Sequence, residues 1–277
     1  MHIEGTVVET IDARSGTGLT IHGLLARRKG ANRLVCFMPA AQVGTGTRRT
    51  KLFSRWTWQN SMPDQHVMAL SDPALALDDE IRGAWFLHPT SDFLPEMAEM
   101  VRRQADRLEV DPSGILFYGS SLGGFGAMGM ASLLPGAGAI CEIPQIDVSQ
   151  WPSPGSIKAM EDRILRMTFD EFRVLHPEMV DVRARFVKSG IIPPFLIVSN
   201  ETDLSIKLQK ELMHFVGTSR LRRIGRQELI LVEKVSGHYS LPQEDALALI
   251  AAWSEQAGLQ GEPHKFGNKY EVTQEVG

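Results

Sequence analysis

Short apolar runs alternate along this chain with longer segments in which apolar positions recur at helical spacing. The runs are typical of strands buried on both faces, and they lie at 34–38, 66–71, 114–118, 138–143, 195–199 and 228–232. The helical segments lie at 121–134, 204–216 and 242–257, with an earlier one that Ser91 or Asp92 can cap and that runs to Leu108. This alternation predicts an α/β fold, with about eight strands in a mostly parallel sheet and helices on both faces.

The chain opens with a different pattern. Segments 6–11 and 19–25 both favour strands, and the residues SGTG at 15–18 between them favour a turn. Two strands so closely joined form an antiparallel hairpin. The predicted sheet is therefore mixed, with an antiparallel edge.

Segment 151–190 interrupts the alternation. It is too long for an ordinary connection, and it contains helical patterns around 157–167 and 169–175. We predict a small helical cap over the carboxyl edge of the sheet; the alternative is a crossover helix that carries a long loop. The cap has more apolar residues than one surface helix hides, so we expect some of them to face a pocket: Ile157, Met160, Ile164, Leu165, Met167, Phe169 and Phe172.

The remaining organisation is simple. Residues 1–257 are predicted to form one domain with the cap inserted at 151–190. Residues 258–277 are polar and without periodicity, which predicts a flexible C-terminal tail.

The strongest chemical signal is the sequence GSSLG at 119–123, directly after a predicted buried strand and directly before a helix. A G-x-S-x-G sequence in this context describes a nucleophile elbow, a sharp turn that holds a serine hydroxyl at the carboxyl edge of the sheet. The glycines permit the turn and the close approach of neighbouring elements. Ser121 is then the candidate nucleophile, and Ser120 points elsewhere. The alternative is a glycine-rich turn of another α/β fold, including a phosphate-binding one.

A serine hydroxyl becomes a good nucleophile when a base takes its proton and an acid orients that base. After an elbow serine, the acid and then the histidine follow in chain order. Asp203 and His238 meet this condition, each just past the carboxyl end of a predicted strand. Asp147 and Glu201 remain as alternative acids. The other histidines considered for the base have strand, loop, cap or helix positions that suit it less, at 22, 66, 88, 176 and 214.

In these features the chain resembles an α/β-hydrolase over nearly its whole length. GSSLG at 119–123, Asp203 and His238 match the nucleophile, acid and base positions of that family in order. More loosely, GSSLGGFGA at 119–127, SDP at 71–73 and PQ at 144–145 resemble hydrolase-like proteins encoded with bacterial surface-polysaccharide and accessory-secretion genes.

The resemblance implies an oxyanion hole built from two backbone N–H groups. One belongs to the residue after the nucleophile, here Leu122, and the other to the loop after the third strand. That loop reads MPAAQVG at 38–44, without the HGGG run of many lipases and esterases. Pro39 has no N–H to donate, so Ala40 or Ala41 is the expected second donor.

Composition limits the classes of partner and cofactor that the protein is expected to bind. A net charge of −4 gives no footprint for nucleic acid or an anionic membrane. Cys36 and Cys141 lie in apolar runs and are expected to be buried thiols; no cysteine or histidine spacing suggests zinc, and no cofactor is expected. The sequence starts without a signal-peptide pattern and has no apolar run long enough to span a membrane, so the expected location is the cytoplasm.

The expected function is a serine hydrolase that cleaves an ester, or less readily an amide or thioester, of a small-molecule or saccharide acyl substrate. The alternatives are an acyltransferase on the same triad and a non-catalytic hydrolase-fold protein of polysaccharide export or assembly. A basic loop follows the third predicted strand, and its cations can either attract an anionic group of the substrate or form a solvated turn. Four aromatic residues can either form the wall of the substrate pocket or pack in the core. These residues are Arg48, Arg49 and Lys51, and Trp56, Trp58, Trp85 and Phe86.

Overall fold

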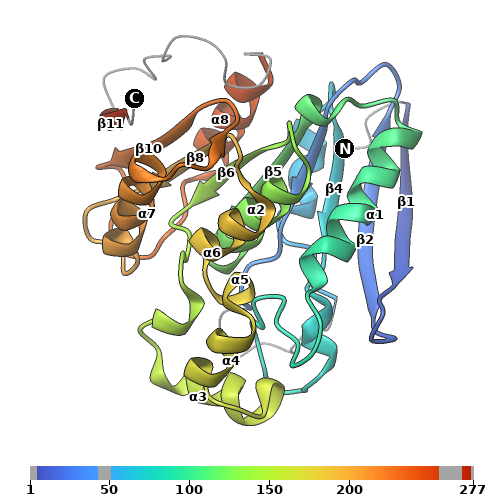
Figure 1. Ribbon diagram of the computed structural model, residues 1–277. Coiled ribbons are helices and arrows are strands. Elements are labelled where there is room, and N and C mark those ends of the chain that lie inside the picture. Colours follow the sequence, from blue (N-terminus) through green and yellow to red (C-terminus); the bar gives the residue numbers. More distant parts are fainter. Residues whose placement is uncertain (1–4, 43–50, 256–269, 276–277) are drawn as a thin grey trace.

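A computed structural model describes residues 5–42, 51–255 and 270–275. The described residues form a nine-stranded sheet in the order β1-β2-β4-β3-β5-β6-β8-β10-β11 (Figure 1). Its strands are β1 (Thr6–Arg14), β2 (Thr20–Arg28), β3 (Leu34–Phe37), β4 (His66–Leu70), β5 (Ile115–Ser120), β6 (Gly138–Glu142), β8 (Phe195–Ser199), β10 (Gln227–Val232) and β11 (Tyr270–Glu275). All pairs from β4 to β10 are parallel, whereas β1–β2, β2–β4 and β10–β11 are antiparallel. The predicted mixed, mostly parallel sheet with its leading hairpin is confirmed.

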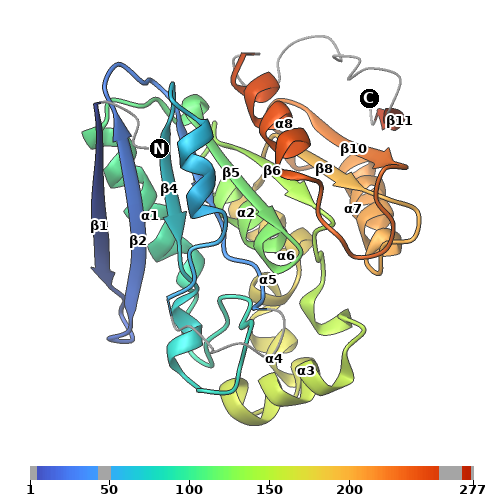
Figure 2. The same cartoon turned by 180° about the vertical axis from the view of Figure 1, so that it is seen from behind.

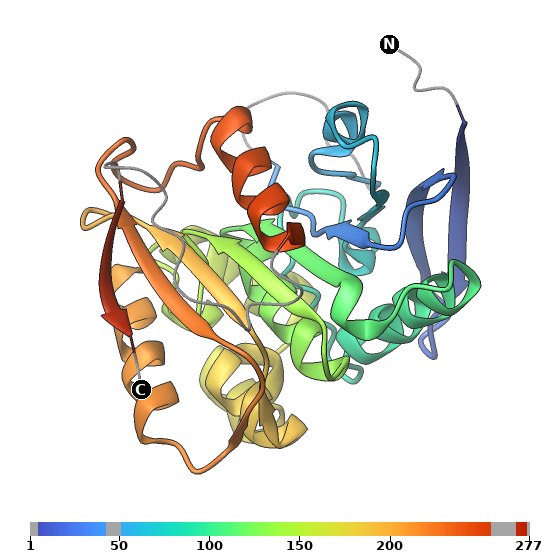
Figure 3. The same cartoon turned by 90° about the horizontal axis from the view of Figure 1, so that it is seen from above.

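Helices cover both faces of this sheet, as predicted (Figure 3). One face carries α1 (Phe93–Arg107), α2 (Leu122–Leu133), α6 (Val182–Ser189) and α7 (Ile206–Thr218), and the other carries α8 (Gln243–Glu255) and the short helix η1 (Trp56–Ser61). The short connecting elements are η2 (Pro73–Ala76), η3 (Pro112–Gly114), η4 (Val148–Gln150), β7 (Ile191–Ile192) and β9 (Arg222–Arg223). Within the described residues, no helix is long and apolar enough to cross a membrane.

The apolar runs belong to strands that are buried on both faces. Successive residues point to opposite sides, so Cys36 and Phe117 join the core under α1, α2 and α6, whereas Phe37 and Tyr118 join the core under α8. This alternation also fixes the last residues of two neighbouring strands. Ser120 and Glu142 share the side of Tyr118 and therefore face the α8 layer.

The C-terminal prediction is wrong for one segment. Tyr270–Glu275 forms β11, which pairs antiparallel with β10. The outer edge of β10 offers unpaired backbone groups, and a polar segment can pair with them without the apolar pattern on which strand prediction depends. The rest of the predicted tail, 258–269 and 276–277, lies outside the described residues.

The segment after β6 divides into two parts. Figures 1 and 2 show α3 (Pro154–Met160) and α4 (Phe169–Leu175) together at one end of the sheet, clear of both helical layers. The π-helical turn η5 (Glu161–Leu165) joins them, and α5 (Pro177–Val180) leads back to α6. Helix α6 packs beside α2, and its Phe186 ring stacks on Phe195 of β8 at 6.2 Å. The predicted cap therefore ends before α6, which is a crossover helix of the main domain.

Most apolar residues of the cap are buried in the main core. Met160, Leu165, Phe169 and Phe172 are each at most 3% exposed and belong to the same cluster as the residues of α1 and α2. These side chains fix the cap onto the domain, so the expectation that some of them face a pocket is not supported.

Candidate functional site

Ser121 occupies the sharp turn between β5 and α2. Its backbone has φ 54° and ψ −119°, a region that residues with a side chain rarely adopt. A Cβ on Gly119 would lie 2.2 Å from the carbonyl oxygen of Gly123, and a Cβ on Gly123 would lie 2.9 Å from the carbonyl oxygen of Pro39. Glycine is therefore required on both sides of the turn, which explains why this serine is flanked as it is.

The structure brings together the three residues that the sequence singled out. His238 Nε2 lies 2.7 Å from Ser121 Oγ, and His238 Nδ1 lies 2.7 Å from Asp203 Oδ2. The Asp203 side chain is fully buried, whereas the His238 ring is 18% exposed. The serine, the imidazole and the carboxylate form one hydrogen-bonded row. The serine of this row lies in the sharp turn that follows β5.

Two further groups hold the Asp203 carboxylate in place. Its Oδ1 accepts hydrogen bonds from the backbone N–H of Ser205 at 2.8 Å and from Gln209 Nε2 at 3.0 Å, which leaves Oδ2 for the imidazole. Gln209 also donates to the carbonyl oxygen of Pro144 at 3.0 Å. No sequence pattern pointed to Gln209, because glutamine is common on helix surfaces and only the fold makes this one buried.

The loop that carries His238 is tied to the loop that carries Asp203. Asn200 Nδ2 donates to the Gly237 carbonyl at 2.9 Å, and the Gly237 N–H donates to Thr202 Oγ1 at 2.7 Å. On its other side the His238 ring packs against Trp151, with ring centroids 4.7 Å apart. These contacts fix the imidazole, and the first residue of the cap segment becomes part of the site.

The alternative acids have other partners. Both oxygens of the Asp147 carboxylate accept from Arg173 Nη2 at 2.6 Å, so this residue anchors α4 of the cap to the end of β6. Glu201 pairs with Lys210 at 2.8 Å on the surface. Among the candidate acids, it is Asp203 that contacts His238.

No protein-family model matches the chain, and no curated protein matches it in sequence. Its backbone does match solved structures. An S-formylglutathione hydrolase from Agrobacterium tumefaciens is 14% identical, with a TM-score of 0.59 over 94% of this chain and 98% of that one. FphF, a fluorophosphonate-binding serine hydrolase of Staphylococcus aureus, is 11% identical, with a TM-score of 0.55 over 90% and 98%. A chain of the glycosylation-associated protein complex of Streptococcus agalactiae is 14% identical, with a TM-score of 0.58 over 94% of this chain and 47% of that one.

The chain has the α/β-hydrolase fold. At these identities the likeness establishes the architecture and leaves the reaction to be argued from the site.

In an α/β-hydrolase the oxyanion donors come from the residue after the elbow serine and from the loop after the third strand. Leu122 is the first residue of α2, where a backbone N–H has no partner within the helix. In the loop after β3, Ala40 donates its N–H to Ser54 Oγ at 3.0 Å, and Gln42 donates to the Arg82 carbonyl at 2.7 Å. Among the described residues no acceptor takes the N–H of Ala41, which makes Ala41 the better of the two predicted donors.

The packing of Gly83 places Ala41 beside Leu122. A Cβ on Gly83 would lie 2.9 Å from both the Ala41 Cβ and the Leu122 Cδ1. The backbone at Gly83 therefore packs against both residues that carry the candidate oxyanion donors.

The carboxylate of Asp72 holds the residues that follow Gly83 in the chain. Its buried carboxylate accepts from the N–H groups of Ala74 and Phe86, both at 3.0 Å. Trp85 and Phe86 are held at positive φ, 52° and 60°, and Trp85 Nε1 donates to Gln145 Oε1. Asp72 thus supports two residues at positive φ, Trp85 and Phe86, close to Gly83 in the chain.

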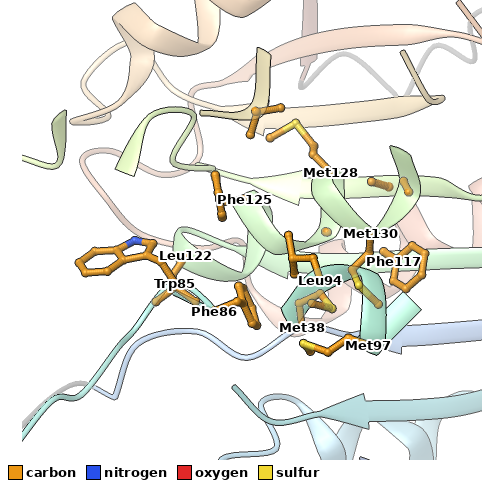
Figure 4. Close-up of a cluster of buried hydrophobic side chains, with 14 of the residues drawn as sticks. Met38, Trp85, Phe86, Leu94, Met97, Phe117, Leu122, Phe125, Met128 and Met130 are labelled. Carbon is orange, nitrogen blue, oxygen red and sulfur yellow. The ribbon is translucent and has the colours of Figure 1, made fainter. Parts of the chain in front are cut away.

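The aromatic residues proposed as pocket walls pack instead in the core. Trp85 and Phe86 are 4% and 2% exposed, and Figure 4 shows both with Leu122 at one end of a buried apolar cluster. Trp58 packs on Phe37 under the α8 face, with ring centroids 5.7 Å apart, and Trp56 is partly buried against the same core. Arg48 and Arg49 of the basic loop lie outside the described residues.

Asp72 makes the stability of the fold depend on pH. Burial raises the pKa of its carboxyl to about 6, and the N–H groups of Phe86, Ala74 and Ala84 oppose that rise. In the unfolded chain the carboxyl titrates near its ordinary pKa of about 3.9. The folded state therefore keeps a proton that the unfolded state loses, and this contribution to stability is full below about pH 4 and is lost as the pH rises through about 6.

The Asp72→Asn variant isolates this effect, because its amide does not titrate. We expect the free energy of unfolding of the wild type, minus that of the variant, to fall by on the order of 3 kcal/mol between pH 4 and pH 7. Urea unfolding of both proteins at several pH values measures it. A difference that stays constant with pH would show that Asp72 does not hold a proton in the folded state.

In the part of the chain that the structure describes, no cluster of three or more histidine, cysteine, aspartate or glutamate side chains is suited to a metal ion. Cys36 and Cys141 are buried free thiols.

Proposed function

We propose that this protein is a serine hydrolase that cleaves carboxylic esters through an acyl-enzyme. The observation that carries the proposal is the row Ser121–His238–Asp203, joined by two hydrogen bonds of 2.7 Å and ending in a fully buried carboxylate. A hydroxyl, an imidazole and a carboxylate in this order are the parts that activate a serine. Esters of small molecules or saccharides are the proposed substrates.

In the proposed reaction, Ser121 Oγ attacks the ester carbonyl carbon while its proton moves to His238 Nε2. Asp203 holds the Nδ1–H of the ring, which keeps Nε2 free to accept that proton and stabilises the imidazolium that forms. The imidazolium then protonates the leaving alcohol, and the acyl group remains on Ser121. Water then gives a proton to His238 Nε2 and attacks the acyl carbon; the bond to Ser121 Oγ breaks, His238 returns the proton to that oxygen, and the acid is released.

The negative charge that develops on the carbonyl oxygen needs donors already in place. The N–H groups of Leu122 and Ala41 are proposed for this role. Preorganised donors of this kind contribute most when they point at the charge that forms in the transition state.

Pre-steady-state kinetics with p-nitrophenyl acetate and a panel of longer acyl esters test the proposal. We expect a burst of nitrophenol that approaches one equivalent of enzyme, followed by slower turnover, or steady turnover where deacylation is fast. Addition of an alcohol then separates hydrolysis from acyl transfer by the ratio of acid to new ester. A folded protein that turns over none of these esters would contradict the proposal.

The spacing of the two oxyanion donors gives a further prediction. The added methyl group of Gly83→Ala must displace Ala41, because its Cβ would lie 2.9 Å from the Ala41 Cβ and 3.3 Å from the Ala41 Cα, whereas the end of the Leu122 side chain can turn away. We expect kcat to fall by roughly 10- to 100-fold with a smaller change in KM, since the loss falls on the transition state. Ester kinetics of the purified variant provide the measurement.

Gly129→Ala is the matched control. Its new Cβ would meet Leu94 Cδ1 at 2.6 Å, between α2 and α1, so it crowds the core to a similar degree away from Ala41. We expect it to lower thermal stability and leave kcat near the wild-type value. Equal kcat losses in both variants would mean that Gly83 acts only through packing.

A further inference from the structure

A buried ion pair lies on the side of the sheet that faces α8, next to the strand ends that lead to the site. Arg55 Nη2 is 3.9 Å from Glu142 Oε1, and the two side chains are 11% and 1% exposed. The guanidinium lies over the rings of Trp58 and Tyr118, at 5.1 and 5.3 Å. Aromatic faces and a carboxylate thus surround one cation.

The pair contacts both segments that carry the proposed reacting groups. Arg55 Nη2 donates to Ser120 Oγ at 2.9 Å, on the residue before Ser121. It also lies 3.4 Å from Ser240 Oγ, in the loop that carries His238. One guanidinium nitrogen therefore bridges the turn of the serine and the loop of the histidine.

Glu142 makes the same connection through its other atoms. Its Oε2 accepts from the Leu241 N–H at 2.7 Å, where the histidine loop turns toward α8. Its backbone carbonyl accepts from the N–H of Ser121 at 3.0 Å. The glutamate is thus bonded to the serine itself and to the loop of the histidine.

A third connection comes from the residue before Arg55. Ser54 Oγ accepts from the N–H of Ala40, in the loop that holds the candidate oxyanion donor Ala41. Arg55 itself has φ 58° and ψ 15°, a left-handed conformation that is uncommon for arginine. The side chains of Ser54 and Arg55 thus contact the oxyanion loop, the elbow and the histidine loop.

The pair is poorly built for stability alone. Within the described residues, Arg55 Nε, Glu142 Oε1 and Tyr118 Oη have no hydrogen-bond partner. Burial raises the pKa of the Glu142 carboxyl, and the charge of Arg55 opposes that rise. A buried ion pair with incomplete hydrogen bonding often stabilises a fold less than apolar residues of the same size would. Its contacts therefore point to a role in the geometry of the site.

We propose that Arg55 and Glu142 are positioning residues that hold Ser121 and the His238 loop at the separation required for proton transfer. This rests on the proposed function, because it assigns a role in activating Ser121. Without the pair, the elbow and the histidine loop lose the guanidinium that bridges Ser120 and Ser240, whereas the backbone bond between Ser121 and Glu142 remains. The serine and the imidazole then spend less time within hydrogen-bond distance, and reactivity falls.

The double variant Arg55→Met/Glu142→Gln tests this role. Each single variant leaves an unpaired polar group in the core, and Arg55→Met leaves a buried carboxylate, so both singles are expected to lower the melting temperature strongly. The double variant removes both charges and is expected to recover much of that loss. Its second-order rate of labelling by a fluorophosphonate probe is still expected to be roughly 10- to 100-fold below wild type, with kcat for an ester reduced more than KM changes.

A second buried pair provides the control. Arg185 and Asp92 pair between α6 and the start of α1, and their side chains are 2% and 16% exposed. Arg185→Met/Asp92→Asn removes the same kinds of charge from a site that contacts neither Ser121 nor the histidine loop. We expect this variant to lose stability and to keep the wild-type labelling rate.

The outcomes are distinct. A folded Arg55→Met/Glu142→Gln protein that is labelled as fast as wild type overturns the inference and leaves the proposed function standing. A wild-type protein that does not react with the probe overturns the proposed function. If the double variant does not fold, Arg55→Lys decides the question. Lysine keeps the positive charge but lacks the planar guanidinium group with its several N–H donors, and we expect several-fold slower labelling. A wild-type rate in Arg55→Lys would also overturn the inference.

Discussion

Ser121→Ala is expected to lose ester hydrolysis by a factor on the order of 10³ or more, and to keep its fold. The variant has no hydroxyl to attack the carbonyl, whereas the turn is held by contacts that alanine retains, such as the bond from its backbone N–H to Glu142. Alanine meets the same backbone strain as serine at φ 54°. Values of kcat/KM, together with circular dichroism and the melting temperature, measure both parts of this prediction.

Ser132→Ala is the control for this change. Ser132 lies on α2, the helix that begins after Ser121, and its hydroxyl donates to the Gly129 carbonyl at 2.8 Å. The variant therefore loses a buried hydroxyl that is not part of the Ser121–His238–Asp203 row. It is expected to lose some stability and retain its kcat. Unchanged turnover in purified Ser121→Ala would remove Ser121 from the mechanism.

Asp203→Asn is expected to reduce kcat by roughly 10³- to 10⁴-fold, the second largest effect. Oδ1 of Asp203 accepts from two N–H donors, those of Ser205 and Gln209. The amide oxygen of asparagine must take that position, which turns its NH2 group toward His238 Nδ1. The imidazole must then accept at Nδ1 and carry its proton on Nε2, so it can no longer take the proton of Ser121. Ester kinetics across pH 6 to 9 measure the loss.

Asp147→Asn separates the two candidate acids. Asp147 binds Arg173 and anchors the cap, so its amide variant is expected to lower the melting temperature while kcat stays within several-fold of wild type. A large loss of kcat in Asp147→Asn, with little loss in Asp203→Asn, would reverse the assignment of the acid.

The sequence indicated the fold so well because its parallel strands are buried on both faces. Leu34–Phe37 and Phe195–Ser199 read as uninterrupted apolar runs, and a helix follows each of several such runs. The positions of Ser121, Asp203 and His238 could be predicted for the same reason. Each lies just after a recognisable strand, and the carboxyl ends of parallel strands meet at one edge of the sheet.

Other features depend on contacts that leave no local pattern. Gln209 and Arg55 are residue types common on protein surfaces, and only the fold makes them buried partners of the site. The pairing of β11 depends on the free edge of β10 and not on apolar periodicity. In the cap, composition could not decide whether Phe169 and Phe172 line a pocket or pack the core, because both environments are apolar.

An activated Ser121 hydroxyl should react covalently with a reagent that is selective for nucleophilic serines. Wild-type protein treated with a fluorophosphonate probe and examined by intact mass and peptide mapping is predicted to carry one adduct, on the peptide that contains Ser121. Ser121→Ala is predicted to carry none, and Ser132→Ala is predicted to label like wild type. Absence of an adduct in the folded wild type, or an adduct on a different serine, would contradict the account.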